Sequence, residues 1–584
     1  MTTNARKIAF ACLSALLLAA CAEKKEKEIK PRDPEAPRAD VAYLTDVQHL
    51  VRVSLDLRGA RPTLAEIEAV ENASDPQAKI REYAVKYMED ARFRERVKEI
   101  WNEGFLVRQD RPYFPGPPQL LGLVTEDDFA RSATQEPLEL IAHVVANNRP
   151  FTEIVTAEYT VANETLAAYY DITRPTDKGR GWMESEYTDG RPVGAGILAS
   201  TSFYTRWTTT DSNQNRGRAN AWTRAVLCYD FFTRDIIVDT NINLADPNVV
   251  NNAVRTNPSC VGCHQSLDPL ASHFFGYFIP EDVGEGERSY PIKTYSADLE
   301  NRWQQGTGRD PGYFGTYATD PNLATIGEQI AADPGFSSCA VKRFTSVLTG
   351  VSVKELDTDY HLAEIDRLHD WFLETDYDAK RLIEEIVMSP EYRIAGPNST
   401  TSVELADKLH GLKLLSPEAL NRMLRDLTGN RKGDNPAGFG WKIEDPLGYD
   451  LFENDIYGFR MMAGGYDGNF STAPAHTVNA THILTLRMAS ADASGKMVDE
   501  EFSKGRSNRR LLTEVDADTT SEAEIKEQIV VLNKLLYGEI VTVTHADVTD
   551  AYTLWTTVAA RQDPAYAWKI TLGAMLSDVR VAFY

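Results

Sequence analysis

The chain has 584 residues, of which 42% are hydrophobic, and its 86 acidic residues outnumber 62 basic ones to give a formal net charge of −24. A surface with this excess of negative charge repels the phosphates of nucleic acids and anionic lipid headgroups, so we expect neither as a main partner. The length and the apolar content suffice for several hydrophobic cores.

The first 20 residues have the layout of a secretory signal peptide. A short basic start precedes an apolar run from Ile8 to Ala20, and Cys21 follows. A permanent bilayer-spanning helix needs roughly 20 apolar residues, and this run is shorter. Its ending, Leu-Ala-Ala-Cys, resembles the lipobox of bacterial lipoproteins, which implies lipidation of Cys21. The alternative is a plain secretory signal that happens to contain this cysteine.

The residues after the signal predict a membrane-tethered, exported protein. Ala22 rather than aspartate follows Cys21, which in such lipoproteins favours the outer membrane. Residues 21–42 are charged, contain proline and have almost no apolar side chains, so we expect a solvated tether. We therefore expect an outer-membrane lipoprotein that faces the periplasm or the cell surface and contacts the membrane only through its lipid anchor.

Helical signals dominate the rest of the chain, and the predicted fold class is mainly α. Thr63 and Glu66 form a capping box before apolar residues at helical spacing. Residues 151–215 are mixed and loop-rich, residues 216–232 have a helical pattern, and the segment 234–250 is turn-rich.

Further helices are predicted in the second half. An irregular segment, 280–320, is rich in Gly, Pro and Tyr, and residues 323–350 then have the pattern of two helices. Asp378 precedes another periodic apolar segment, and Ser416-Pro417 opens a helix in the last third of the chain.

Residues 260–264 read Cys-Val-Gly-Cys-His. A c-type haem needs two thiols at this spacing to bond its vinyl groups, and a histidine directly afterwards as an axial ligand of the iron. The motif predicts one covalent haem c held by Cys260 and Cys263, with His264 on the metal.

Three other interpretations of this motif remain open. A zinc knuckle would need two further ligands, usually a second pair at similar spacing, which the sequence lacks. A redox-active dithiol would follow a strand of a βαβ unit, whereas the residues before Cys260, Thr256-Asn257-Pro258, are typical of a turn. A chance occurrence is the third.

The second axial position of such an iron is also open. A second histidine would lower the reduction potential relative to a methionine, and an open position would permit ligand chemistry. The candidates besides an open position are His273, His361, His369, Met183 and Met388.

Two cysteines remain once Cys12 leaves with the signal, Cys21 takes lipid and the motif takes haem. These are Cys228 and Cys339, and in an oxidising compartment we predict that they form a disulfide. It would connect a helix before the haem motif to one after it. Two buried free cysteines are the alternative.

Several segments resemble the exported cytochrome c proteins of the planctomycete and myxobacterial type, a multidomain family with domains of unknown function around a single CxxCH. Residues 51–70 are similar to its opening segment, and residues 257–275 to its haem segment, in which CxxCH is followed by Asp-Pro. The other similar segments are 202–228, which contains Arg216-Gly217, the closing segments 339–353 and 378–393, and an accessory module at 420–430 and 457–470.

The resemblance implies haem attachment at Cys260 and Cys263 and axial ligation by His264. It also implies that Asp268-Pro269 either orients His264 through a backbone carbonyl or caps a helix. Two positions depart from the family pattern, because Ala271 replaces a glycine and Phe275 stands where a glutamate is usual.

Together these observations predict a lipid-anchored monohaem c-type cytochrome that exchanges single electrons with redox partner proteins. The alternatives are a haem-dependent oxidoreductase or peroxidase, for which the sequence offers no catalytic constellation, and a non-redox surface lipoprotein that binds through its aromatic-rich regions. The predicted organisation is a signal peptide (1–20), a tether (21–42), an N-terminal helical domain (43–190), a haem c domain with closing helices (191–400) and a helical accessory domain (401–584).

Overall fold

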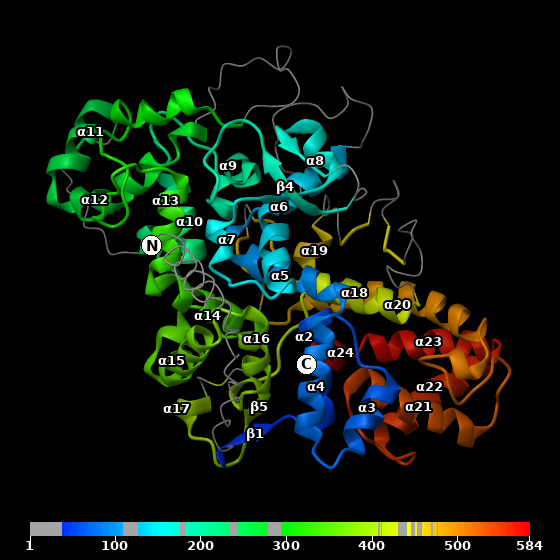
Figure 1. The fold of residues 1–584 in the computed structure, drawn as a ribbon. Coiled ribbons are helices and arrows are strands. Elements are labelled where there is room, and N and C mark those ends of the chain that lie inside the picture. Colours follow the sequence, from blue (N-terminus) through cyan, green and yellow to red (C-terminus); the bar gives the residue numbers. More distant parts are fainter. Residues whose placement is uncertain are drawn as a thin grey trace, which may run out of the picture. The chain divides into compact units, whose positions relative to one another are not determined.

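Helices make up most of the chain and the strands are few and short, which confirms the mainly α fold class (Figure 1). The predicted signal peptide, the lipidation site Cys21 and the tether up to residue 37 lie outside the described residues. The computed structural model describes residues 38–584 apart from 109–125, 176–180, 234–241, 244, 278–293, 407–408, 410, 430–440, 445–449, 453–457, 469–470 and 476.

The elements follow the order labelled in Figure 1. The first part contains α2 (Asp46–Arg58), α3 (Leu64–Glu71), α4 (Pro76–Met88), α5 (Ala91–Phe105), α6 (Glu126–Ala146), α7 (Glu153–Thr156), α8 (Glu164–Tyr169), α9 (Thr201–Arg206) and α10 (Arg216–Val226). The middle contains α11 (Pro247–Thr256), α12 (Pro258–Ser272), α13 (Leu323–Ala332), α14 (Pro334–Thr349), α15 (Asp359–Glu374), α16 (Ala379–Met388) and α17 (Val403–Ala406). The last part contains α18 (Pro417–Leu427), α19 (Phe459–Met462), α20 (Ala480–Phe502), α21 (Glu522–Tyr537), α22 (Ala546–Ala559), α23 (Pro564–Leu576) and α24 (Val579–Ala582).

Capping residues set many helix starts, as their sequence predicts. The capping box of Thr63 and Glu66 opens α3, and the Asp378 side chain accepts the backbone N–H groups of Lys380 and Arg381 at the start of α16. One segment was predicted wrongly, because α11 begins at Pro247 inside the segment predicted to be turn-rich. An Asp-Pro pair is compatible with both structures, and here the aspartate caps the helix while the proline takes its first position.

Two small sheets connect distant segments. Strand β1 (Val41–Tyr43) pairs antiparallel with β5 (Ile394–Pro397), so the start of the described chain lies beside residues far along the sequence. Strand β4 (Met183–Tyr187) lies between β2 (Thr160–Ala162) and β3 (Ile172–Thr173). The last residue also returns to an earlier segment, because Tyr584 and Lys413 exchange backbone hydrogen bonds.

One large hydrophobic core extends from α2 to the C-terminal helices and includes residues from all three predicted domains. A smaller cluster around Phe129 and Tyr169 packs on the three-stranded sheet. None of the helices within the described residues combines the length and the apolar character that crossing a bilayer requires.

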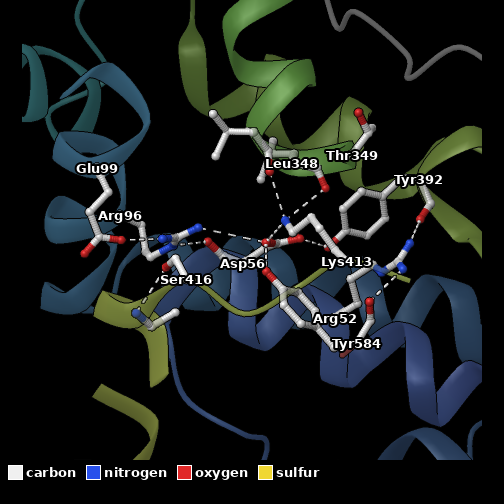
Figure 2. A network of polar contacts seen from close by, with 12 residues as sticks. Arg52, Asp56, Arg96, Glu99, Leu348, Thr349, Tyr392, Lys413, Ser416 and Tyr584 are labelled. Atoms are coloured by element: carbon white, nitrogen blue, oxygen red, sulfur yellow. Dashed lines mark hydrogen bonds and ion pairs between the residues drawn. The ribbon is translucent and has the colours of Figure 1, made fainter. Parts of the chain in front are cut away.

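A buried carboxylate lies where α2, the end of α14 and the C-terminus meet (Figure 2). Asp56 is fully buried and accepts hydrogen bonds from the hydroxyls of Tyr392, at 2.7 Å, and Tyr584, at 2.8 Å. The Lys413 ammonium forms an ion pair with the same carboxylate and donates to the backbone carbonyls of Val347 and Leu348. Burial lowers the pKa of Lys413 to about 8, against the opposing effect of Asp56.

We expect Asp56→Asn to lower the free energy of unfolding by about 3–5 kcal/mol, because the substitution leaves the Lys413 ammonium buried without its counter-charge. Chemical denaturation followed by circular dichroism measures the change. The control is Asp499→Asn, which removes an exposed ion pair with Lys569 and should cost less than about 1 kcal/mol. Equal losses in the two variants would contradict the prediction.

A second prediction concerns acid sensitivity. His49 on α2 is fully buried, and its Nε2 lies 2.8 Å from the carbonyl oxygen of Val387. Burial lowers its pKa to about 3 from an ordinary value of 6.5. As the pH falls below 6.5, His49 becomes protonated in the unfolded chain but stays neutral in the folded chain. The free energy of unfolding therefore falls by about 1.4 kcal/mol per pH unit because of His49.

Accordingly, His49→Gln should flatten the dependence of the unfolding free energy on pH between 6.5 and 4.5. The matched control is His545→Gln at an exposed helix start, which should leave that slope unchanged. Identical slopes for His49→Gln and the unaltered protein would show that His49 is protonated in the folded state.

Candidate functional site

The CVGCH motif occupies the first two turns of α12. Asn257 caps this helix by accepting the backbone N–H of Ser259, and Pro258 takes the first helical position. The turn predicted before the motif is therefore the start of the helix that presents it. In Figure 1, α12 lies beside α11 and α10, the two helices against which it mainly packs.

Helical spacing brings the three motif side chains to neighbouring positions. Cys263 follows Cys260 by three residues and His264 follows it by four, and residues at these spacings lie on one face of a helix. Neither cysteine is in a disulfide, and both are partly exposed, as is the His264 ring. Two cysteine sulfurs and an imidazole thus lie together at an accessible surface of α12.

The His264 imidazole contacts a buried carboxylate of the same helix. The Nδ1 atom of His264 lies 2.8 Å from Oδ1 of Asp268, one helical turn further along α12. Asp268 is fully buried, and Arg216 donates to both of its oxygens, from Nε at 2.6 Å and from Nη2 at 3.1 Å. The three side chains form a continuous chain of polar contacts from α10 to the motif.

The charge state of Asp268 fixes the tautomer of His264. Burial by itself raises the pKa of Asp268, but the hydrogen bonds from His264 and Arg216 outweigh burial and bring it below its ordinary value. The group is therefore an ionised carboxylate at neutral pH and can only accept hydrogen bonds. His264 must donate its Nδ1–H to it, which leaves the Nε2 lone pair available for a metal.

The helix that supplies Arg216 is itself fixed at its far end. Arg216 is the first residue of α10, and Cys228, just after the end of α10, forms a disulfide with Cys339 on α14. The disulfide expected from the sequence is thus present, and it connects the helix before the motif to one after it. Its position restrains the helix on which the orientation of His264 depends.

The role of Asp268 differs from both of the roles that the resemblance implies. Asp268 acts on His264 through its carboxylate rather than through a backbone carbonyl, and it lies inside α12 rather than at a cap. The role of Arg216 was missed, although the Arg216-Gly217 pair was part of the resemblance. Sequence alone could not pair Arg216 with Asp268, because 52 residues separate them.

The candidates for the second axial position lie in different parts of the fold. His273 follows His264 by nine residues, which is two and a half helical turns, so the two rings leave α12 on opposite faces. They cannot approach one iron from its two sides. The remaining candidates lie on elements other than α10 and α11, namely His361 and His369 on α15, Met388 at the end of α16 and Met183 on β4.

Two cysteines and a following histidine are the residue types that a c-type haem requires, at the spacing it requires. Within the described residues, no group of three or more His, Cys, Asp or Glu side chains is arranged to hold a metal ion, whereas structural zinc takes four ligands. Metal-bound histidines usually donate their other ring N–H to a carboxylate or a carbonyl, as His264 does to Asp268. The residues that would hold a haem are Cys260, Cys263 and His264.

Residues 44–172 match the family model of PSD4, a protein of unknown function (DUF1592). The PSD4 match extends from just before α2 into β3 and ends well before α12. It is consistent with the resemblance to a family that contains domains of unknown function. No curated protein and no solved structure matches the chain.

Proposed function

We propose that the chain is a monohaem c-type cytochrome that transfers single electrons. The observation that carries this proposal is the orientation of His264 by Asp268 and Arg216, directly after two cysteines that form no disulfide and have the spacing that haem attachment requires. A haem bound there supplies an iron that cycles between its ferric and ferrous states.

Each residue of the site has a distinct task in this proposal. Cys260 and Cys263 form the two thioether bonds, and His264 presents Nε2 to the metal. Asp268 accepts the hydrogen bond from Nδ1–H, which fixes the neutral tautomer whose free nitrogen is Nε2, and it makes the imidazole a stronger electron donor. Arg216 neutralises the buried carboxylate, so the ring keeps one orientation without an uncompensated charge inside the protein.

The location and the partners belong to the same proposal. The predicted lipoprotein signal would place the chain at the outer membrane, in the compartment where c-type haem is attached. Redox proteins would be its partners, and a net charge of −24 would favour those with a basic docking surface.

Covalent haem is the first expectation. When the chain is produced with cytochrome c maturation proteins, denatured protein should stain for haem after boiling, and its pyridine haemochrome spectrum should show one haem with two thioether bonds per chain. Cys260→Ser/Cys263→Ser should lose the stain. Cys228→Ser/Cys339→Ser should retain it, because those cysteines form the disulfide. Absence of covalent haem from the unaltered chain would overturn the proposal.

The reduction potential tests the role of Asp268. Asp268→Asn keeps the side-chain volume but removes the negative charge next to His264, so the imidazole donates less electron density and the potential should rise. Potentiometric titration measures it, and covalent haem content should not change. The control is Asp246→Asn, at the cap of α11, which should leave the potential unchanged. A potential unaffected by Asp268→Asn would show that this carboxylate does not act on the axial ligand.

A further inference from the structure

A cavity of about 260 Å³ lies between α5, α14 and the residues that lead into α18. Among the described residues, its lining has six basic and three acidic side chains, although acidic residues outnumber basic ones in the chain as a whole. The lining includes no residue of α12. The cavity is therefore separate from the proposed haem site, and its charge balance is the reverse of that of the whole protein.

Several of these charges are satisfied within the protein. Arg96 forms an ion pair with Glu99, and Lys413 forms one with Asp56 in the network of Figure 2. Lys98 likewise contacts Glu139 at 2.6 Å. These pairs build the wall of the cavity and are not free to bind a ligand.

Arg343 on α14 differs because it has no acidic partner. Its guanidinium is buried, and its Nε and Nη2 donate to the backbone carbonyls of Ala225 and Arg224. No carboxylate of the described residues lies within ion-pair distance of it, and its Nη1 has no acceptor among them. An arginine in this state has a full charge and three unused N–H donors next to the cavity.

Glu103 on α5 is the complementary group. It lines the same cavity, and its carboxylate forms no hydrogen bond or ion pair with the described residues. Burial raises the pKa of Glu103 to about 7, opposed by Arg96, Arg343 and Lys413 and assisted by Glu418. The Glu103 side chain is half-buried, so its carboxylate is reachable from the cavity and can accept a hydrogen bond from a ligand there.

The residue next to Glu103 allows Arg343 to lie where it does. A Cβ atom on Gly104 would lie 2.7 Å from the guanidinium carbon of Arg343, which is closer than such atoms approach. A glycine inside a helix costs about 1 kcal/mol relative to alanine, and here it permits the guanidinium to rest against α5. The start of α18, at Ser416 to Glu418, also lines the cavity and adds partial positive charge.

We propose that this cavity binds a small organic acid that also carries a hydroxyl or amino group. The carboxylate of the ligand pairs with Arg343 in the positive part of the cavity, and its hydroxyl or amino group donates to Glu103. A simple cation would meet Arg343, and a ligand with several negative charges would meet Glu103, so neither fits both groups. The volume is below the roughly 300–1,000 Å³ of pockets for drug-sized ligands, so the ligand is small.

The test is isothermal titration calorimetry of the purified chain with glycerate and with galacturonate, which are both hydroxy acids. Glycerol, galactose and propionate are the controls, because the first two lack the carboxylate and the third lacks the hydroxyl groups. We expect at least one hydroxy acid to bind, and the controls to bind at least tenfold more weakly. Failure of both hydroxy acids, or equal binding of a control, would overturn the proposal.

Two variants connect the binding to these residues. Glu103→Gln should weaken binding of the hydroxy acid at least tenfold, with Glu384→Gln at the surface of α16 as the matched control. Gly104→Ala should also weaken it by displacing Arg343, whereas Gly495→Ala, where an added Cβ meets nothing, should not. Undiminished binding in Glu103→Gln would overturn the proposal even if Gly104→Ala fails to fold. Haem staining is independent of these measurements, so this proposal and the haem proposal can fail separately.

Discussion

The buried carboxylate of Asp56 is the interaction on which the arrangement of the chain depends. It accepts hydrogen bonds from the hydroxyls of Tyr392 and Tyr584 and forms an ion pair with the Lys413 ammonium, so it connects α2 to three distant segments (Figure 2). A charge buried this deeply is tolerated only where several donors surround it. The same lysine reaches the last carbonyls of α14, which brings the helix with Cys339 into the network.

A further series of contacts connects α14 to the proposed haem site. The disulfide connects α14 to the end of α10, and the other end of α10 supplies Arg216 to Asp268. Asp268 in turn orients His264 within α12. The proposed axial ligand on this accessible helix therefore takes its orientation from a series of buried contacts that ends in the central core. These contacts give the partly exposed His264 ring a fixed orientation.

The cavity beside the Asp56 network follows from the same construction. The segment around Lys413 contacts α2 and α14 from one side, and α5 contributes Glu103 from the other. Ion pairs satisfy much of the charge brought together there, but the geometry separates Glu103 from Arg343 by more than an ion-pair distance. The PSD4 match, residues 44–172, includes the lining residues of α5 and α6 but not those of α14 or of the segments after it, so the cavity needs residues from both inside and outside the matched segment.

Local signals in the sequence determined most helices and the motif itself. Capping residues such as Thr63 and Asp378 act within a few positions of themselves, and CVGCH is contiguous, so both are readable without a fold. The cysteine count was also enough to predict the Cys228–Cys339 pair. Only the tertiary structure decided that Arg216 meets Asp268, that Asp56 joins four segments, and that Glu103 and Arg343 share a cavity. These contacts join residues from 52 to more than 500 positions apart, and their strength depends on burial, which a linear sequence does not show.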